Sequence, residues 1–304
     1  MKFDPKYLIT IIGPTAIGKT ALAIKIAKHF DTEIISADSR QFYKEMSIGT
    51  AVPSLVELNE VKHHFIQDRS IFEDYSVGQF ERNALEKLNT LFKDNKKVVM
   101  VGGSGLYVDV VLKGLDDFPD VDPQLRKNLK LQLKEKGIAY LQDQLKELDE
   151  ETWQKIDLEN HQRLIRALEI CIGTGKKYSS YLTDKQSKRD FSPIKIGITA
   201  DRETVYNRIN QRVDLMMEEG LLKEAKQLYK YKDLNALQTV GYKELFNYFE
   251  GKWDFDCAIS EIKKNTRRFA KRQGTWFRKD EDIQWFDYQE DLKIIIEYID
   301  SKIK

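Results

Sequence analysis

The chain carries the sequence Gly13-Pro14-Thr15-Ala16-Ile17-Gly18-Lys19-Thr20, whose fixed positions match the pattern GxxxxGK[ST]. The stretch before it, residues 7–12, is apolar and rich in β-branched side chains, which predicts a buried strand. Residues 19–30 repeat apolar side chains at helical spacing, which predicts a helix. A strand, a glycine-rich turn and a helix in this order are typical of a phosphate-binding loop, the P-loop.

Phosphate binding explains each residue type in this motif. Glycines allow backbone N–H groups to turn inward around phosphate oxygens, and the helix N-terminus adds positive potential. Lys19 can neutralise a terminal phosphate, and the Thr20 hydroxyl can ligate Mg²⁺. The motif therefore predicts a diphosphate or triphosphate site over Gly13 to Thr20 that uses Mg²⁺, and it does not by itself indicate nucleotide hydrolysis.

Further strands and helices alternate along the chain. Residues 33–37, 98–101 and 194–199 are short apolar runs of strand length, and residues 76–95 have helical periodicity. Alternating strands and helices indicate an α/β fold with a mainly parallel sheet. Together with the motif, they predict a P-loop NTPase-like core.

The pattern changes between residues 116 and 193. This segment contains no convincing strand, but it has long charged stretches of helical character, such as 123–136 and 160–172. We predict that residues 116–193 form a helical insertion in a catalytic core made of residues 1–115 and 194–304. The part of the core over residues 201–279 is expected to be helical again.

Composition limits the class of protein. The chain has 304 residues, 50 lysines and arginines against 49 aspartates and glutamates, and a hydrophobic fraction of 41%. It can bury a large core, and its balanced charge excludes a polybasic tail protein. Cys171 and Cys257 are too few and too far apart for a disulfide framework, which suits a reducing compartment. Because no window approaches the length of a membrane span, we expect a soluble cytoplasmic protein with no membrane partner.

A carboxylate is expected near the P-loop. In many P-loop NTPases a second strand ends in an aspartate that helps to hold Mg²⁺. Here the predicted strand 98–101 is followed by Gly-Gly-Ser-Gly, which offers no carboxylate. Asp38 is the only acid that the pattern places at a strand end on the side of the P-loop. From the residues alone, Asp38 either organises the metal or acts as a general base.

Several further segments, in order along the chain with the P-loop, resemble the tRNA dimethylallyltransferase (tRNA isopentenyltransferase) family. The resemblance covers about residues 8–278. Because the chain ends near Lys304 without the zinc finger of eukaryotic relatives, we expect the bacterial type. The matching segments are Asp38-Ser39-Arg40-Gln41-Phe42-Tyr43, His63-His64-Phe65-Ile66, Tyr75-Ser76-Val77-Gly78-Gln79-Phe80, Gly102-Gly103-Ser104-Gly105-Leu106-Tyr107, Gln162-Arg163-Leu164-Ile165-Arg166-Ala167-Leu168-Glu169, Arg212-Val213-Asp214-Leu215-Met216, Val240-Gly241-Tyr242-Lys243-Glu244 and Ala270-Lys271-Arg272-Gln273-Gly274-Thr275-Trp276-Phe277-Arg278.

The resemblance implies a reaction and its partners. Members of the family transfer a dimethylallyl group from dimethylallyl diphosphate to the exocyclic amine of the adenosine 3′ of the tRNA anticodon, with Mg²⁺. Diphosphate is the leaving group, which explains a P-loop without nucleotide hydrolysis. The insertion is expected to grip the anticodon stem-loop, and the target base to be extruded from its stack. We expect a monomer.

The resemblance also implies roles for single residues. Asp38 is expected to be the base that accepts the proton of the adenine amine, with metal ordering as the alternative. Ser104 stands where the family usually has threonine, and its hydroxyl is expected to bond the diphosphate or the target nucleotide.

Two arginines are predicted on the other side of the leaving group. Arg208 and Arg212 are four residues apart on a predicted helix, so they share a face and can close over the diphosphate. Surface salt bridges with Glu203 or Asp214 are the alternative.

Contacts to tRNA are expected on several segments. By the family match they involve Asp38, Ser39, Arg40, Gln41, Ser104, Arg126 and the run Gln162-Arg163-Leu164-Ile165-Arg166. Residues 260–279 hold eight lysines and arginines against one acid. On a helix this is a track for the phosphate backbone that includes Lys271 and Arg272. For Trp276 and Phe277, which follow, we expect core packing rather than stacking on RNA.

Three other functions compete with this hypothesis. A small-molecule P-loop kinase explains the motif and Asp38, but it leaves the basic stretch unused. An adenylate isopentenyltransferase that acts on free AMP or ADP does not need a helical insertion. A non-catalytic RNA-binding protein does not need Lys19, Thr20 and Asp38 together.

Overall fold

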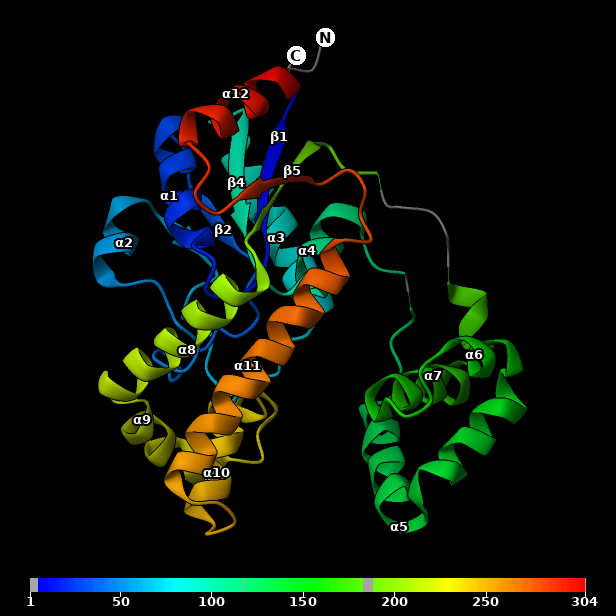
Figure 1. Ribbon diagram of the computed structural model, residues 1–304. Helices are drawn as coiled ribbons and strands as arrows, with labels where there is room; N and C mark the ends of the chain where they lie inside the picture. Colours follow the sequence, from blue (N-terminus) through cyan, green and yellow to red (C-terminus); the bar gives the residue numbers. More distant parts are fainter. Residues whose placement is uncertain (1–4, 117, 183–187, 304) are drawn as a thin grey trace. The chain divides into compact units, whose positions relative to one another are not determined.

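The computed structural model describes residues 5–116, 118–182 and 188–303, which form a six-stranded parallel sheet and a set of helices (Figure 1). The strand order is β3-β2-β4-β1-β5-β6, and all neighbouring pairs are parallel. The predicted α/β class with a parallel sheet is thus confirmed. The strands are β1 (Tyr7–Ile12), β2 (Ile34–Ser36), β3 (His63–His64), β4 (Lys97–Val101), β5 (Ser192–Thr199) and β6 (Gln284–Asp287).

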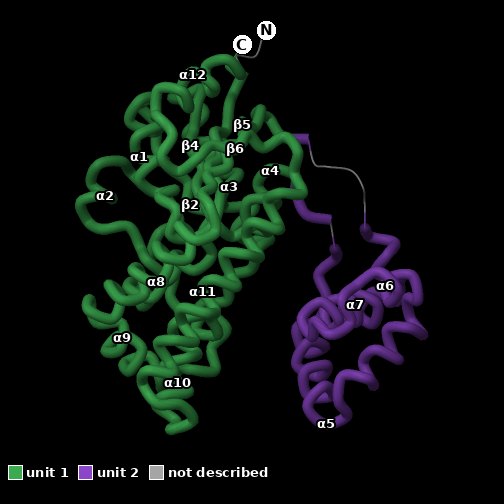
Figure 2. The backbone as a smooth tube through the Cα atoms, viewed as in Figure 1, with its two compact units in different colours: residues 1–113, 189–304 green, residues 114–188 purple. Residues whose placement is uncertain are grey.

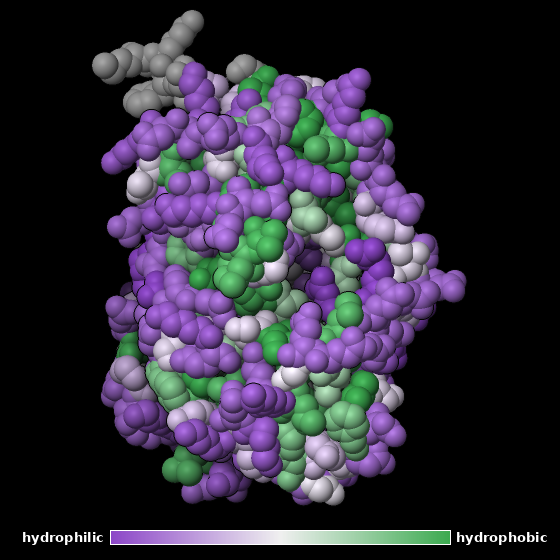
Figure 3. Space-filling model, turned by 90° about the vertical axis from the view of Figure 1, so that its left-hand side faces the viewer, coloured by the Kyte–Doolittle hydropathy of each residue, from purple (hydrophilic) through white to green (hydrophobic). Residues whose placement is uncertain are grey.

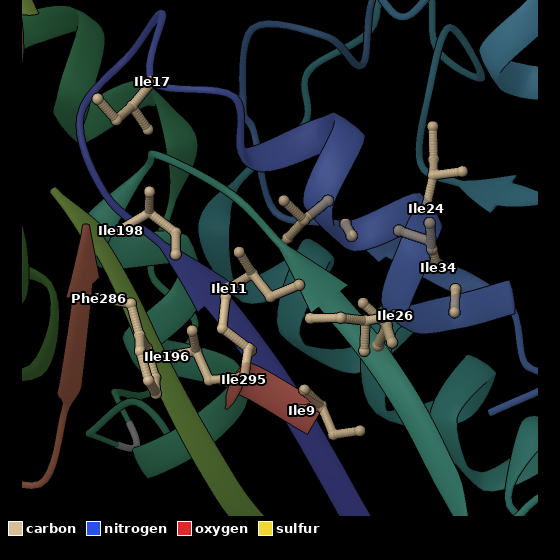
Figure 4. Packing of buried hydrophobic residues seen from close by; sticks show 14 of the residues in the cluster. Ile9, Ile11, Ile17, Ile24, Ile26, Ile34, Ile196, Ile198, Phe286 and Ile295 are labelled. Atoms are coloured by element: carbon tan, nitrogen blue, oxygen red, sulfur yellow. The ribbon is translucent and has the colours of Figure 1, made fainter. Parts of the chain in front are cut away.

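Strand β1 lies inside the sheet and is buried along its whole length. Its side chains alternate between the two faces, as the pleat of a strand requires. Ile9 and Ile11 join a cluster with helices α1 (Lys19–His29) and α12 (Leu292–Lys302), which Figure 4 shows from close by. Leu8 and Ile12 join a second cluster with α3 (Val77–Leu91) and α4 (Gly105–Lys113). Burial on both faces explains why the strand is an uninterrupted apolar run.

Four helices after β5 pack into a third apolar cluster. They are α8 (Arg202–Glu218), α9 (Leu221–Leu228), α10 (Tyr242–Phe249) and α11 (Phe255–Phe277), with short 3₁₀ turns at Tyr229–Tyr231 and Asn235–Leu237. This confirms the helical character predicted for residues 201–279. The chain between β2 and β3 adds the short helix α2 (Leu55–Glu60), which begins at a capping box of Ser54 and Glu57.

Two strands were not predicted from the sequence, and both lie at the edges of the sheet. Strand β3 consists of two histidines, and β6 alternates exposed residues with the buried Phe286. An edge strand is covered less than a central one, so it does not need the continuous apolar run on which the sequence prediction relied. Strand β6 also places a second acid, Asp287, at the end of a strand, which corrects the expectation that Asp38 alone occupies such a position.

The chain divides into two compact units (Figure 2). Unit 1 comprises Met1–Lys113 and Arg189–Lys304, and unit 2 is the insertion Gly114–Lys188. The sequence analysis set the second boundary at residue 193. The structure sets it earlier because Ser192 and Pro193 already belong to β5. Arg189 is also fixed to unit 1, since its guanidinium donates to Val110 O and Val111 O.

Unit 2 has its own apolar core and, in its described residues, consists of helices and loops. Its helices are α5 (Pro123–Leu148), α6 (Glu150–Lys155), α7 (His161–Thr174) and a 3₁₀ turn at Tyr178–Tyr181. Helix α5 is kinked at Gly137, where φ is 81°, a value that glycine adopts without strain. Asp149 links α6 to the 3₁₀ turn within this unit, because its carboxylate accepts hydrogen bonds from Thr152 and Ser179. None of the helices among the described residues is both long enough and apolar enough to cross a bilayer.

Candidate active site and RNA contacts

The P-loop connects β1 to α1 as the motif predicts. Gly13 and Gly18 have φ values of 146° and 103°, in the region that side chains rarely adopt. A Cβ at Gly13 would also lie 2.4 Å from Ile198 O of β5. Ala16 and Ile17 are buried in the cluster under the loop (Figure 4). The loop is therefore fixed both by backbone conformation and by packing.

Lys19 begins α1 and turns back over the loop. Its ammonium group donates to Pro14 O at 2.7 Å. Burial lowers the pKa of Lys19 to about 8; the nearby Asp38 carboxylate opposes this shift, and Arg212 adds to it. A phosphate anion bound at the loop would add negative charge beside this half-buried cation and so favour its charged form.

Arg208 and Arg212 both reach this region from α8. Arg208 Nε donates to Ala16 O at 2.7 Å, so it contacts the P-loop itself. Burial lowers the pKa of Arg212, as does the positive charge of Arg208, while Asp38 opposes the shift. Asp214, proposed above as a surface partner, instead binds Lys263 at 2.6 Å. Both arginines are therefore available as anion ligands beside the loop.

A large cavity of about 840 Å³ opens over the P-loop. It is lined by residues 16–21, by α8 residues that include Arg208 and Arg212, and by parts of the segment 47–58. Figure 3 shows the face that carries α1, α2, α8 and α9, where the surface is hollowed between hydrophilic and hydrophobic side chains. The volume and the cationic lining suit a diphosphate ester.

A small cavity of about 80 Å³ adjoins the large one, and it holds Asp38. Ala51, Arg212 and Met216 line both cavities. The small cavity has a mostly apolar lining with some polar residues; its walls include Thr15, Asp38, Arg40, Val213, Leu221, Val240, Ile262 and Phe269. An apolar recess between an anion cradle and a carboxylate can shelter a short hydrocarbon group.

Asp38 lies in a turn directly after β2. Its Oδ1 accepts a hydrogen bond from Arg40 N at 3.1 Å, and its charge acts on Lys19, Arg40 and Arg212. Burial lowers the pKa of Arg40, and the Asp38 carboxylate opposes that shift. A carboxylate that acts on three cations is placed to accept a proton from a neutral amine while the positive charges balance it.

Ser104 lies beside the Asp38 turn. The N–H of Ser39 donates to Ser104 Oγ at 3.1 Å, and the two hydroxyls are 3.0 Å apart. The approach is close because Gly102 packs on Ala37, where a Cβ would come within 2.6 Å of Ala37 O. Ser104 therefore supports the turn that carries Asp38, in addition to any contact with a substrate.

Gln41 is engaged within the protein. Its amide nitrogen donates to Ala51 O at 2.8 Å and to Thr50 O at 3.2 Å. Gln41 was expected above to contact tRNA, but its amide nitrogen already holds the segment that lines both cavities. The side-chain oxygen is the group that it can offer to RNA.

Two residues that support the site were not singled out in the sequence analysis. Gln273 of α11 accepts from Thr15 N of the P-loop at 2.8 Å and donates to Gly103 O at 2.9 Å. The N–H of Thr15 is thus engaged within the protein, so not every backbone N–H of the site predicted over Gly13 to Thr20 is free to bind phosphate. The signal was available: Ile262, Ala270, Gln273 and Phe277 share the buried face of α11, and one of them is polar.

The second residue that supports the site is Glu224. Its carboxylate accepts from three successive backbone N–H groups, Ser47, Ile48 and Gly49, at 2.9 to 3.0 Å, and from Tyr242 OH at 2.6 Å. Successive N–H groups that point to one place form an anion-binding nest. Glu224 thereby fixes the cavity wall from α9. The sequence gives no signal for this contact, which joins residues about 175 positions apart.

In unit 2 the predicted RNA contacts separate into two groups. Gln162 and Arg163 are exposed at the start of α7. Arg126 and Arg166 are about 40% exposed, and both bind the buried Glu169, at 2.7 and 3.3 Å. One carboxylate thus holds two guanidinium groups side by side and leaves a net positive charge.

Leu164 and Ile165 of the same run are a correction. Their side chains are 0% and 2% exposed and lie in the core of unit 2. They fall on the apolar face of α7, so they anchor the helix and do not present side chains to RNA.

The basic stretch on α11 is partly neutralised. Lys263 binds Asp214, and Lys264 binds Glu261 at 2.7 Å. Lys271 and Arg272 are exposed near the end of the helix, and they stay candidates for phosphate contacts. Phe277 is buried as expected. Trp276 is exposed, which contradicts the expected core packing; its indole donates to Asp109 at 2.8 Å and it packs on Gly105.

Mg²⁺ would need few protein ligands here. Among the described residues, no group of three or more histidines, cysteines or acids is arranged so that it could hold a metal ion. Mg²⁺ at phosphates is usually held by one or two protein oxygens together with substrate oxygens and water. Thr20 lines the large cavity beside Lys19, so its hydroxyl fits that pattern.

Comparison with known proteins gives a consistent result. Residues 41–280 match the family model described as IPP transferase. The chain is 60% identical to the tRNA dimethylallyltransferase of Flavobacterium johnsoniae over 305 aligned positions, which cover 98% of this chain and 99% of that protein.

Solved structures agree. The full-length tRNA isopentenylpyrophosphate transferase of Bacillus halodurans is 36% identical with a TM-score of 0.73, over 98% of this chain and 97% of that one. A eukaryotic dimethylallyltransferase acting on tRNA has a TM-score of 0.80 at 27% identity, over 94% of this chain and 74% of that one. The P-loop NTPase-like core expected from the sequence is the fold of these enzymes. The chain belongs to the IPP transferase family, that of the bacterial tRNA dimethylallyltransferases.

Proposed function

We propose that this enzyme transfers a dimethylallyl group from dimethylallyl diphosphate to the exocyclic amine of the adenosine 3′ of the tRNA anticodon. The observation that carries the proposal is the pair of adjoining cavities. The P-loop lines one, Asp38 lines the other, and Arg212 lines both. A donor with its diphosphate on the P-loop can therefore extend its hydrocarbon toward the carboxylate.

The leaving group is held by cations and N–H groups. Lys19, Arg208 and Arg212 stabilise the charge that grows on the diphosphate as the carbon–oxygen bond breaks. The Thr20 hydroxyl would hold Mg²⁺, which when bound supplies further positive charge to the diphosphate oxygens. Preorganised cations do not need to reorient during the reaction, so their stabilisation is fully effective in the transition state.

Asp38 acts on the acceptor. The adenine amine is a poor nucleophile because its lone pair is delocalised into the ring. As the new carbon–nitrogen bond forms, the carbon–oxygen bond of the donor breaks, diphosphate departs, and a proton passes from the amine to the Asp38 carboxylate. The position of Asp38 in the small cavity supports this role.

The macromolecular substrate is tRNA, and we place its anticodon stem-loop as the recognised part. Support comes from the exposed Gln162 and Arg163, from the pair Arg126 and Arg166, and from Lys271 and Arg272. Arginines and lysines bind the phosphate backbone, and the target base must leave its stack to reach a buried carboxylate. We propose that the enzyme acts as a monomer in the cytoplasm, where its substrate is found.

The test is direct. The protein is incubated with tRNA, Mg²⁺ and dimethylallyl diphosphate, and nuclease fragments are examined by mass spectrometry. We expect a five-carbon addition on the fragment that contains the adenosine 3′ of the anticodon. Parallel reactions with AMP or ADP as acceptor, and with ATP as donor, examine the two rival enzymes. A product in either of these, without modified tRNA, would contradict the proposal.

A further inference from the structure

Gln273 connects two parts of the site that are far apart in the sequence. Its side chain is 6% exposed on the buried face of α11. The amide oxygen accepts from Thr15 N at 2.8 Å, and the amide nitrogen donates to Gly103 O at 2.9 Å. Both polar atoms of this buried side chain therefore form hydrogen bonds, the oxygen with one loop and the nitrogen with the other.

The two loops have different tasks. Thr15 belongs to the P-loop, which holds the leaving group in the proposed reaction. Gly103 directly precedes Ser104, whose hydroxyl accepts from Ser39 N, next to Asp38. Three hydrogen bonds, together with the peptide link between Gly103 and Ser104, thus connect the phosphate cradle through Gln273 to the turn that carries the base.

We propose that Gln273 is a positioning residue that sets the distance between the diphosphate cradle and Asp38. The inference rests on the proposed function and goes beyond it, since Gln273 contacts neither reacting group. Transfer requires the amine, the donor carbon and the base to be aligned at once, and errors of about 1 Å in such alignment cost on the order of 100-fold in rate.

The chemistry of the contact favours an amide. A glutamine offers an acceptor and a donor at the same end of its side chain. Glutamate keeps the acceptor but has no donor for Gly103 O. Methionine has about the same length and can bond neither loop.

The contact with Gln273 also requires a glycine at position 103. A Cβ there would lie 2.3 Å from Gln273 Nε2 and 3.7 Å from Lys19 Nζ. Gly103→Ala must therefore displace the amide. The contact can be broken from either of its two ends, by substitutions 170 residues apart.

The experiment compares Gln273→Met, Gly103→Ala and the double variant in tRNA prenylation, with turnover expressed per folded molecule. We expect each single variant to lower kcat by about 10- to 100-fold. KM for tRNA and for the donor should change by less than about threefold, because binding groups are untouched. The double variant should be no slower than the slower single variant, because both break one contact.

Matched controls lie on the same helix. Gly274→Ala adds a Cβ that meets nothing within 4 Å, and Thr275→Ala removes an exposed hydroxyl. Both should keep wild-type kcat. Gln273→Glu retains one of the two bonds and should show a smaller loss, which also provides a second variant if Gln273→Met does not fold.

The outcomes separate the inference from the function on which it rests. Wild-type kcat in folded Gln273→Met or Gln273→Glu would overturn the inference alone, as would fully additive losses in the double variant. A lower melting temperature with unchanged kcat would assign Gln273 to stability only. If the wild-type chain does not prenylate tRNA, the proposed function fails, and the inference with it.

Discussion

At the scale of single residues, the site depends on charges held out of water. Lys19 is half-buried, with a pKa lowered to about 8, and its ammonium donates to Pro14 O. Arg212 and Arg40 are also half-buried, and Asp38 is a carboxylate that acts on all three cations. Such a site attracts an anion, because a diphosphate relieves the cost of burying like charges together.

Lys19 makes anion binding sensitive to pH. Below about pH 8 its amine is charged, and above it the amine is neutral, so affinity for inorganic diphosphate should fall as the pH rises from 7 to 9. Titration calorimetry across this range checks the slope. Lys19→Arg is the control, because its guanidinium stays charged over this pH range. The protonation of the diphosphate itself changes equally in both experiments. Equal slopes in the wild type and Lys19→Arg would contradict the assignment.

The residues of the motif could be predicted from the sequence, because the P-loop needs glycines, a lysine and a hydroxyl at fixed spacing. Asp38 was predicted from its place after a strand. Glu224 was not, since its partners lie far away in the chain and no local pattern marks it. Gln273 was missed although it is a polar residue on the apolar face of α11. Leu164 and Ile165 show the reverse error: a family segment was taken as a unit, although its periodicity already assigned Leu164 to the core.

At the scale of elements, the wall between the cavities is a loop held by helices. The nest of Ser47, Ile48 and Gly49 closes on Glu224 of α9, and Tyr242 of α10 donates to the same carboxylate. Gly49 lies against the Tyr242 ring, where a Cβ would come within 2.6 Å. Burial, together with the Glu224 charge, raises the pKa of Tyr242, so the phenol stays a donor.

Loosening this wall should weaken donor binding. Glu224→Gln keeps the shape of the side chain but replaces one acceptor oxygen by an NH₂ group. This donor faces backbone N–H groups, which then have no acceptor. We expect a loss of about 1–3 kcal/mol in unfolding free energy and a higher donor KM, with tRNA affinity retained. Denaturant melts and steady-state kinetics measure both. Glu218→Gln, at an exposed position on α8, is the control; an unchanged donor KM in Glu224→Gln would count against the wall.

In unit 2, Asp149 ties the end of α5 to α6 and the following turn. Burial alone would raise the pKa of Asp149, but its hydrogen bonds from Thr152 and Ser179 outweigh burial and hold it below the ordinary value of 3.8. The carboxylate therefore stabilises the unit at pH above about 4, and the contribution is lost as the pH falls through the lowered pKa.

Asp149→Asn should destabilise the unit at neutral pH by about 1–3 kcal/mol and flatten the acid limb of its stability curve. Urea melts monitored by the fluorescence of Trp153, with the other tryptophans replaced, follow this unit. Asp143→Asn is a control on the same helix. Parallel acid limbs for the wild type and Asp149→Asn would show that Asp149 does not contribute in this way.

At the scale of the whole molecule, the alternating apolar runs predicted the class of fold. The absence of such runs between residues 116 and 193 predicted the helical insertion. The edge strands were not predicted, because β3 has only two residues and β6 is half-exposed. The basic stretch on α11 also changes at this scale. Two of its lysines form ion pairs with Asp214 and Glu261 in the folded protein, so the positive surface is smaller than the sequence implies.

Lys271 and Arg272 provide a test of the RNA surface. If each contacts a phosphate, its replacement by alanine should weaken tRNA binding for all sequences and reduce the slope of log K against log salt by about 0.7 to 1. Filter binding at several salt concentrations gives the slope. Lys293→Ala, an 81% exposed lysine on α12, is the control. Identical slopes for all three variants and the wild type would remove these two residues from the interface.

The central claim is that one carboxylate takes the proton while the P-loop takes the diphosphate. Asp38→Asn keeps the shape of the side chain and removes its basicity. Single-turnover prenylation of an anticodon stem-loop RNA, with RNA and donor affinities measured beside it, tests this most directly. We predict that Asp38→Asn binds both substrates within about threefold of the wild type and loses at least about 100-fold in the rate of transfer. Transfer at the wild-type rate by Asp38→Asn would contradict the account.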